Sequence, residues 1–354
     1  MRILSVYLMR TIILSSLMVL FVLLSLGALF EFIGQLEDVK GSYGIPEAMT
    51  YSVLRLPQLS FEMLPIAVLI GALLGLGGLA NNSELVVMRT AGLSVARLVG
   101  MVALTGVVLM IFTALIGEFI GPPLDYYART MRTEARFGQE NRNMGNAAWV
   151  KEGNTIFHLE HVNSDYDFGG IYIFRFGEDN TIQSIGRAES AVIDDDDNWH
   201  LENFRETRFQ DGAVLSVQSS TAVESFDIDS ELLGVTMVKP ISLSGRGLLN
   251  YIRYLKRNDL AADRYETELW SRVSATVTVI IMPVLALAFV FGSLRSAGAG
   301  SRLMIGVMIG LGYFLASEMT ANSGVVFGFD PAIVTWMPSI ALLLVTSFAL
   351  SRVR

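Results

Sequence analysis

The chain of 354 residues contains no cysteine. Disulfide bridges, thiolate metal sites and a cysteine nucleophile are therefore excluded. Histidine is scarce too, and His158 and His161 stand three apart on an expected strand, which directs them to opposite faces. The acidic run at residues 194–197 lacks the alternating ligands and the glycine of a calcium loop, so we interpret it as a solvated turn. We expect no metal site.

Two motifs of nucleotide and acyl chemistry are also missing. The sequence has no G-x-x-x-x-G-K-[ST] loop to cradle a nucleotide phosphate. It has no G-x-S-x-G turn that would present a nucleophilic serine. We therefore expect no catalytic residue and no cofactor on this chain.

Charge is in short supply, at 17% of residues, and mean hydropathy is +0.49. A soluble domain carries about a quarter charged residues, so this composition cannot cover a single water-soluble core. Residues 121–270 hold 15 basic and 25 acidic residues, whereas the rest of the chain holds 11 and 9. An acidic insert neutralises phosphates poorly, so we expect no nucleic-acid partner.

Long apolar stretches dominate the two ends of the chain. Crossing a bilayer takes about 20 apolar residues. A cleavable signal peptide is the alternative for the first stretch, but the run is too long and no A-x-A site follows it. A sixth stretch, 303–317, is short but continues past Glu318 to Phe329. The sequence predicts six spans, of which the other five contain residues 11–30, 63–80, 98–117, 273–294 and 331–351.

The loop charges predict an orientation. An excess of arginine marks the cytoplasmic side of a membrane protein. The acidic set of short loops contains Glu31, Glu37, Asp38, Glu47, Glu62 and Asp330 against Lys40 and Arg55. We therefore expect both termini in the cytoplasm and the insert on the far side, which in a bacterium is the periplasm. The basic set of ends and loops, with Glu84 as its one acid, contains Arg2, Arg10, Arg89, Arg97, Arg295, Arg302, Arg352 and Arg354.

The insert changes to a strand-like period after Trp149. Short strands separated by polar turns indicate an antiparallel sandwich or an open roll. Helices flank it at 124–137 and 248–256. We predict an α-helical membrane protein whose domains are residues 1–123, an all-β insert at 124–260, and residues 261–354. The expected strands are 149–151, 155–161, 170–176, 181–193, 199–209 and 214–226.

Two short features lie in and after the second span. Gly71 and Gly75 form a G-x-x-x-G spacing, which allows close helix approach either within the chain or to another subunit, and we favour the former. At residues 83–91, Ser83 can cap a short helix that Gly92 ends, and Ser94 can cap the next one. Such a helix is too short to be stable alone. It either docks on a partner or forms a membrane-surface turn, and it would present Leu85, Val86 and Met88.

The run 71–94, GALLGLGGLANNSELVVMRTAGLS, resembles the coupling region of the LptF/LptG family of lipopolysaccharide-export permeases. The resemblance covers the whole chain, including the order of three spans, a periplasmic β-jellyroll and three spans. It extends to WVK at 149–151, LLNYIRYL at 248–255, LWS at 269–271 and FVFGSLRS at 289–296. The last two motifs are closer to the LptG type than to the LptF type.

The resemblance implies half of the membrane part of an ABC transporter, in the bacterial inner membrane. The chain would pair with an LptF-like subunit as a heterodimer. Two copies of a separate LptB-type ATPase, which would bind ATP and Mg, would dock on the coupling helices. Lipopolysaccharide would leave the outer leaflet through lateral gates at spans one and five and pass to an LptC-type bitopic protein. The residues that the resemblance assigns to ATPase coupling are Ser83, Glu84, Leu85, Val86, Met88 and Arg89.

Two alternatives belong to other classes. One is a membrane-anchored periplasmic lipid-binding or scaffold protein without transport activity, which a docking helix for an ATPase would not suit. The other is an ABC permease of the four-span mechanotransmission type, which the six predicted spans disfavour.

The residues for lipopolysaccharide phosphates depart from the family pattern. The end of span one in this family can carry several lysines, but here it carries Glu31, Glu37 and Asp38. Phosphate contact is expected instead at Arg129, Arg132 and Arg136, which share one helical face at i, i+3 and i+7, and at Lys40 and Arg55. In the alternative, Asp125 pairs with Arg129 and the stripe is only solvated.

The insert is expected to sheathe acyl chains. Ile156 and His158 alternate with Phe157 and Leu159, so one face of the strand can be apolar, and Phe174 is taken as an inward position. The alternative is a packed core without a ligand.

Overall fold

The computed structural model describes residues 2–40, 42–137, 148–160, 167–168, 170–177, 179, 181–193, 198–210, 213–226, 242–292 and 298–352. The chain forms two compact units. One comprises Met1–Val39, Ile45–Arg129 and Asp263–Arg354, and the other comprises Lys40–Gly44 and Thr130–Ala262. His161, residues 194–197 and Arg295 lie outside the described residues.

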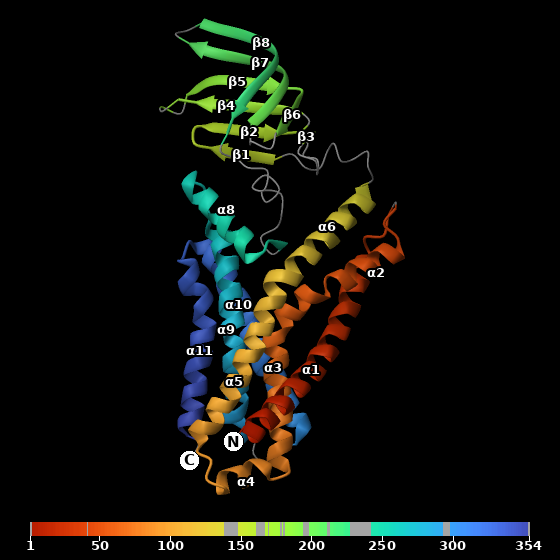
Figure 1. Ribbon diagram of the computed structural model, residues 1–354, viewed down its shortest axis with the longest axis vertical. Helices are drawn as coiled ribbons and strands as arrows, with labels where there is room; N and C mark the ends of the chain where they lie inside the picture. The colour runs from red at the N-terminus through yellow and green to blue at the C-terminus, as the bar shows by residue number, and fades with distance from the viewer. Residues whose placement is uncertain are drawn as a thin grey trace. The chain divides into compact units, whose positions relative to one another are not determined.

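The first unit is a helical bundle, coloured red to gold and blue in Figure 1. Six of its helices are long and apolar enough to cross a membrane, which confirms the six predicted spans. Two short helices, α2 (Ile45–Leu54) and α4 (Glu84–Thr90), connect them. The first three spans are formed by α1 (Arg2–Leu36), α3 (Leu56–Asn81) and α5 (Val95–Leu115). The last three are α9 (Asp263–Phe291), α10 (Ala299–Phe327) and α11 (Pro331–Ser351).

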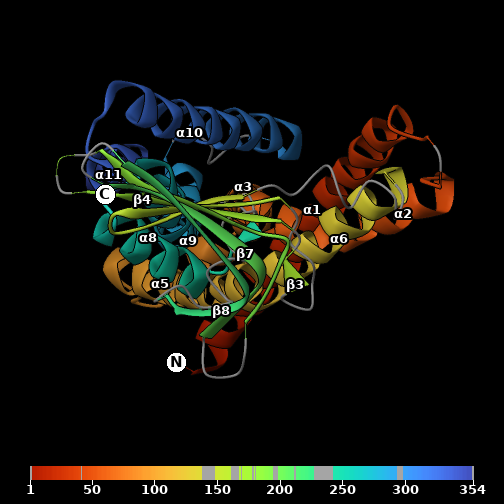
Figure 2. The same cartoon turned by 90° about the horizontal axis from the view of Figure 1, so that it is seen from above.

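The spans differ widely in burial. Within their most apolar windows, α3 is 72% buried and α9 is 61% buried, whereas α10 is only 11% buried. A helix that is apolar all round and surrounded by others forms the centre of a bundle. α3 and α9 are therefore central, and α10 lies at the margin in Figure 2.

The Gly71–Gly75 spacing brings α3 and α1 together. A Cβ on Gly71 would lie 2.3 Å from the Cα of Ser16, and one on Gly75 would lie 2.9 Å from the Oγ of Ser15. Only glycine permits helix backbones to approach so closely. The glycines serve packing within the chain, as predicted.

The third span continues as a helix through Pro122 and Pro123. A five-residue π-helix, Ile116–Ile120, joins α5 to α6 (Gly121–Phe137), and the candidate span runs from Val95 to Arg136. The two prolines fall in the first turn of α6. There the missing N–H is tolerated, since the wider π turn absorbs the irregularity.

The second unit is built on one antiparallel sheet of eight strands in the order β1-β2-β4-β5-β7-β6-β3, with β8 on β7 (Figure 1). The predicted strand 181–193 is divided at Glu189, opposite Asn203, whose φ is 50°. Both halves pair with the long strand β7, so the sheet bends there. The strands are β1 (Ala148–Glu152), β2 (Thr155–Leu159), β3 (Asp167–Phe168), β4 (Ile171–Phe176), β5 (Ile182–Ala188), β6 (Ser190–Ile193), β7 (Asn198–Gln210) and β8 (Ala213–Ser225).

One face of this sheet is buried. Phe157 pairs with Ile173 across β2 and β4, and both are fully buried, which confirms the predicted alternation. The Phe157 ring lies 5.9 Å from Trp199 and 4.6 Å from Phe226, so this face is packed by the chain's own aromatic side chains. Phe174 alternates with Ile173 and stacks at 5.9 Å on the exposed Trp149 of the other face. The assignment of Phe174 as inward was wrong by one residue of strand register.

A charged cluster lies on the same buried face. The Glu206 carboxylate accepts hydrogen bonds from Ser184 and Arg208, each at 2.8 Å, and pairs with Arg175, which also reaches Glu224 at 2.9 Å. Burial acts to raise the pKa of Glu206, but the hydrogen bonds and the arginine charges outweigh it and hold that pKa below its ordinary value. This cluster ties β4, β5, β7 and β8 together.

Helix α8 (Gly245–Arg257) covers the edge of the sheet at β1. Its Tyr254 hydroxyl accepts from the Lys151 N–H at 3.0 Å and donates to the Lys151 carbonyl at 2.8 Å. A side chain thereby satisfies both main-chain groups of an edge residue, which blocks further strand pairing at that point.

Candidate functional site

Helix α4 follows α3 after a turn of two residues. The turn is tight, because Ser83 adopts a left-handed conformation with φ 63° and makes no side-chain cap. The prediction that Ser83 caps α4 was wrong, since a capping residue needs an extended backbone to aim its hydroxyl at the helix. Gly92, with φ 91°, follows the end of α4, and the Ser94 hydroxyl accepts from the Arg97 N–H at 3.3 Å, both as predicted.

The two faces of α4 have different surroundings. Leu85 and Met88, 1% and 7% exposed, pack into the core of the bundle. Val86 and Val87 are 41% and 62% exposed. The prediction that α4 presents Leu85 and Met88 was wrong, because both side chains anchor the helix in the bundle; its exposed face is centred on Val86 and Val87. The i, i+3 spacing of Leu85 and Met88 is the sequence signal that separates these faces.

Both charged ends of α4 contact other spans. The Tyr7 hydroxyl of α1 donates to the Glu84 carboxylate at 2.7 Å. The Arg89 guanidinium lies 5.7 Å from the centre of the Phe291 ring in α9, a cation–π contact. Sequence reasoning missed Tyr7 and Phe291, which are far from α4 in the chain.

A second cluster, which we call the Asp125 network, joins α1, α3 and α6. Asp125 is fully buried, and its two carboxylate oxygens accept from Arg55 Nε at 3.1 Å and from Arg129 Nε at 2.7 Å. Arg55 also reaches Glu31 of α1 at 2.8 Å through Nη1. Arg55 and Arg129, predicted separately as phosphate ligands, are thus held side by side on one carboxylate.

The other basic residues predicted for lipid phosphates lie in the second unit. Arg132 and Arg136 are half-buried on the last turns of α6, and the continuous helix keeps them at i+3 and i+7 from Arg129. Lys40 is exposed and forms an isolated backbone bridge with Tyr43. The predicted pair of Asp125 with Arg129 is present, so the solvated-stripe alternative holds for Arg129 in part, although Asp125 is buried rather than solvated.

Comparison with known proteins decides the family. The family sequence model described as "Lipopolysaccharide export system permease LptF/LptG" matches residues 6–352 of this chain. The chain belongs to the LptF/LptG family. It is 33% identical over 349 residues to the "Lipopolysaccharide export system permease protein LptG" of Escherichia coli K12, covering 98% of this chain and 97% of that protein. Identity is 31% to the LptG of Haemophilus influenzae, over 95% of this chain and 94% of that protein. Identity is 24% to the LptF of Escherichia coli K12, over 93% of this chain and 89% of that protein.

Membership in the LptF/LptG family makes this chain a membrane permease subunit of the LptG type rather than an enzyme. With six apolar helices, it is a multi-pass protein of the inner membrane.

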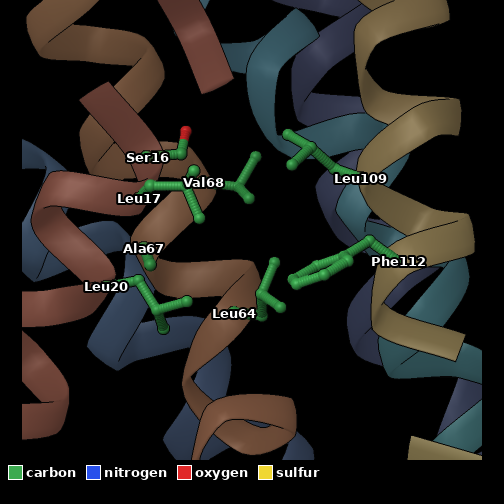
Figure 3. Close-up of a pocket in the computed structure, with 8 residues that line it drawn as sticks. All are labelled: Ser16, Leu17, Leu20, Leu64, Ala67, Val68, Leu109 and Phe112. Carbon is green, nitrogen blue, oxygen red and sulfur yellow. The ribbon is translucent and has the colours of Figure 1, made fainter. Parts of the chain in front are cut away.

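The spans of this LptF/LptG chain enclose a small apolar pocket between α1, α3 and α5. Figure 3 shows side chains of the three helices converging on it, with Phe112 and Leu109 facing Leu64 and Val68. The Ser16 hydroxyl is buried there without a hydrogen-bond partner. The pocket is lined by Ser16, Leu17, Leu20, Leu64, Ala67, Val68, Leu109 and Phe112.

Proposed function

We propose that this LptG-type chain is one half of the membrane part of an ABC transporter that extracts lipopolysaccharide from the outer leaflet of the inner membrane. The observation that carries the proposal is α4. It is a short helix between two spans, seated by Leu85 and Met88, with an exposed face at Val86 and Val87. Seven residues do not form a stable helix without such support. A supported helix with an apolar outer face is suited to transmit force from a docked ATPase.

The orientation that we propose places α4 and both termini in the cytoplasm. In Figure 1 the N- and C-terminal ends of the bundle lie near α4. Arg89 of α4, Arg97 at the start of α5 and Arg352 at the end of α11 belong to this end. Their positive charge favours the cytoplasmic side, which leaves the β-sheet unit in the periplasm.

The partners of the proposed transporter follow from this arrangement and from the family. An LptF-type subunit would complete the permease as a heterodimer, since relatives of both types align over nearly the whole chain. Two copies of an LptB-type ATPase would bind ATP and Mg and engage the coupling helices of the two subunits. An LptC-type bitopic protein would receive the lipid for the periplasmic bridge.

The Asp125 network supports a site for lipid phosphate. Asp125 holds the guanidinium groups of Arg55 and Arg129 in place, so neither has to be ordered when an anion binds. Arg132 and Arg136 follow Arg129 along the same helix, and Lys40 stays a separate predicted phosphate contact. A phosphate would bind on the outer side of these guanidinium groups, and Glu31 and Asp125 would limit the net positive charge.

Co-purification and transport test the function. We expect the tagged chain to bring down an LptF-type subunit and an ATPase, and the reconstituted complex to release lipopolysaccharide only with ATP. A chain that binds lipopolysaccharide but recruits no ATPase would instead establish the scaffold alternative. Reporter fusions at Arg89 and Arg295 should read cytoplasmic and one at Asp195 periplasmic. A cytoplasmic signal at Asp195 would refute the orientation.

Glu84 can serve either to bind the ATPase or only to accept the internal hydrogen bond from Tyr7, and two variants distinguish these roles. A carboxylate on α4 can receive a charge-assisted hydrogen bond from an ATPase arginine. Glu84→Gln should weaken ATPase binding or uncouple hydrolysis from release. Tyr7→Phe is the matched control, because it removes the internal hydrogen bond but keeps the carboxylate. If Glu84→Gln and Tyr7→Phe both transport as well as the unmodified chain, Glu84 has no part in coupling.

Charge reversal tests the phosphate site. Arg129→Glu/Arg132→Glu should abolish lipopolysaccharide release while the complex still assembles. The exposed arginine of α5 supplies a control, Arg97→Glu, which reverses one positive charge at the other end of the third span. Near-normal release by the intact double variant would remove these two arginines from the site.

A further inference from the structure

An arginine is buried at the beginning of α10. Arg302 is 1% exposed, and the other buried residues of this helix are Gly306, Gly310 and Gly324. The position is doubly unfavourable for a cation, because burial removes water and the first turn of a helix carries positive partial charge. A charged residue kept within a membrane span under such cost indicates a function.

Glycine in α3 creates the space that Arg302 occupies. A Cβ on Gly77 would lie 2.5 Å from Arg302 Nη1 and 2.6 Å from its Cδ. The neighbouring Gly78 faces open space, since a Cβ there would have no atom within 4 Å. The guanidinium therefore lies directly on the α3 backbone at Gly77, and its Nη2 donates to Asn81 Oδ1 at 2.9 Å.

Two glycines of α10 contact apolar side chains of α3. Gly306 faces Leu73 and Ile70, and Gly310 faces Ile66. Glycine against aliphatic side chains gives close packing without directional bonds. Arg302 is a polar attachment at the α4 end of this seam.

Asn81 is the last residue of α3, and α4 begins at Glu84. The connection is stiff, since the Asn82 N–H donates to the Gly78 carbonyl and the Ser83 N–H donates to the Ala80 carbonyl. Asn81, which accepts the hydrogen bond from Arg302, is therefore joined to α4 by a short hydrogen-bonded turn.

We propose that Arg302 is a positioning residue that couples the ATPase-docking helix α4 to α10. This inference rests on the proposed function of α4. In this proposal Gly77 and Asn81 hold the guanidinium of Arg302, so that the start of α10 moves with the α3–α4 junction. Gly306 and Gly310, which pack on aliphatic side chains of α3, let the other end of α10 tilt against α3.

The first test measures geometry in the full-length permease pair without nucleotide. The chain has no native cysteine, so spin labels at Thr90→Cys in α4 and Met304→Cys in α10 report one distance. We expect a narrow distance distribution that Arg302→Gln broadens and Arg302→Lys partly restores. Arg97→Gln, which removes an exposed arginine from the first turn of α5, is the control. An unchanged distribution in Arg302→Gln would overturn the proposal, whether or not the complex transports.

The second test measures lipopolysaccharide released per ATP by the reconstituted complex. Coupling between sites commonly amounts to about fivefold or more, so we expect Gly77→Ala and Arg302→Gln to lower this ratio by at least about fivefold. Gly78→Ala should leave it unchanged, because its methyl group meets no neighbour. Equal ratios for Gly77→Ala and Gly78→Ala in assembled complexes would refute the coupling role. If Arg302→Gln fails to assemble, Gly77→Ala and Asn81→Ala decide in its place. Absence of ATP-driven release by the unmodified complex would instead refute the proposed function, and the distance measurement would still decide the role of Arg302.

Discussion

Replacement of Asp125 by asparagine should reveal how much the Asp125 network contributes to the bundle. The carboxylate is fully buried and accepts from Arg55 at 3.1 Å and from Arg129 at 2.7 Å. Hydrogen bonds to charged groups contribute about 1.5–3 kcal/mol each. The side chains of Arg55 and Arg129 are 22% and 26% exposed, so solvent screens these ion pairs. We therefore use the lower end of this range for each hydrogen bond.

Asparagine at position 125 keeps the shape of the side chain and one acceptor oxygen, and Arg55 keeps its ion pair with Glu31. We therefore expect Asp125→Asn to lower the free energy of unfolding by about 2 kcal/mol, or roughly 30-fold in the unfolding equilibrium. The assay is unfolding in mixed detergent micelles with increasing SDS, followed by circular dichroism at a helical wavelength, because the helical signal comes mainly from the bundle.

Glu37→Gln is the matched control, since it neutralises an exposed carboxylate at the same end of α1. Such surface changes usually alter stability by about 0.5 kcal/mol or less. If Asp125→Asn is no more destabilising than Glu37→Gln, the network does not hold α1, α3 and α6 together.

Three further results are expected. Gly71→Ala should destabilise the bundle by about 1–3 kcal/mol in the same assay, because its methyl group would meet the α1 backbone, whereas Gly100→Ala meets no atom within 4 Å; equal effects would contradict the close crossing. Phe157→Ala should lower the stability of the sheet unit by about 3–5 kcal/mol in thermal unfolding of the full-length chain followed by tryptophan fluorescence, and a change under about 1 kcal/mol would show that the aromatic core is loose. The lowered pKa of Glu206 means that its contribution is present above the unfolded value of about 4.3 and is lost as pH falls through the folded pKa; Glu206→Gln should flatten the acid limb of a thermal-stability profile, and an unchanged limb would exclude Glu206 as its source.

Sequence patterns predicted correctly those features that depend on whether each residue favours water or an apolar environment. Charge-free stretches long enough for a bilayer predicted the six spans, since a charge within the hydrocarbon core is costly wherever the helix lies. Alternation at Phe157 and Leu159 identified the buried face of β2, because a strand exposes alternate residues to opposite sides.

Errors arose where a neighbour distant in sequence determines the local backbone or face. Ser83 does not cap α4, because the chain turns there through a left-handed residue to bring Leu85 into the bundle. The prediction that Phe174 points inward was wrong, because the sheet register, and not the residue type, decides which side of β4 is buried.

The amino-acid sequence by itself determined the number of spans, the family, the presence of a β insert and the existence of a short helix near residue 84. These depend on hydropathy, residue period and motif, which are properties of neighbours along the chain. Only the tertiary structure decided that Tyr7 bonds Glu84, that Asp125 gathers Arg55 and Arg129, and that Arg302 lies on Gly77. Each of these contacts, apart from the i, i+4 pair of Asp125 and Arg129, joins residues at least 70 positions apart in the sequence. Helix packing brings such residues together, and neither spacing nor composition encodes which face of one helix meets which face of another.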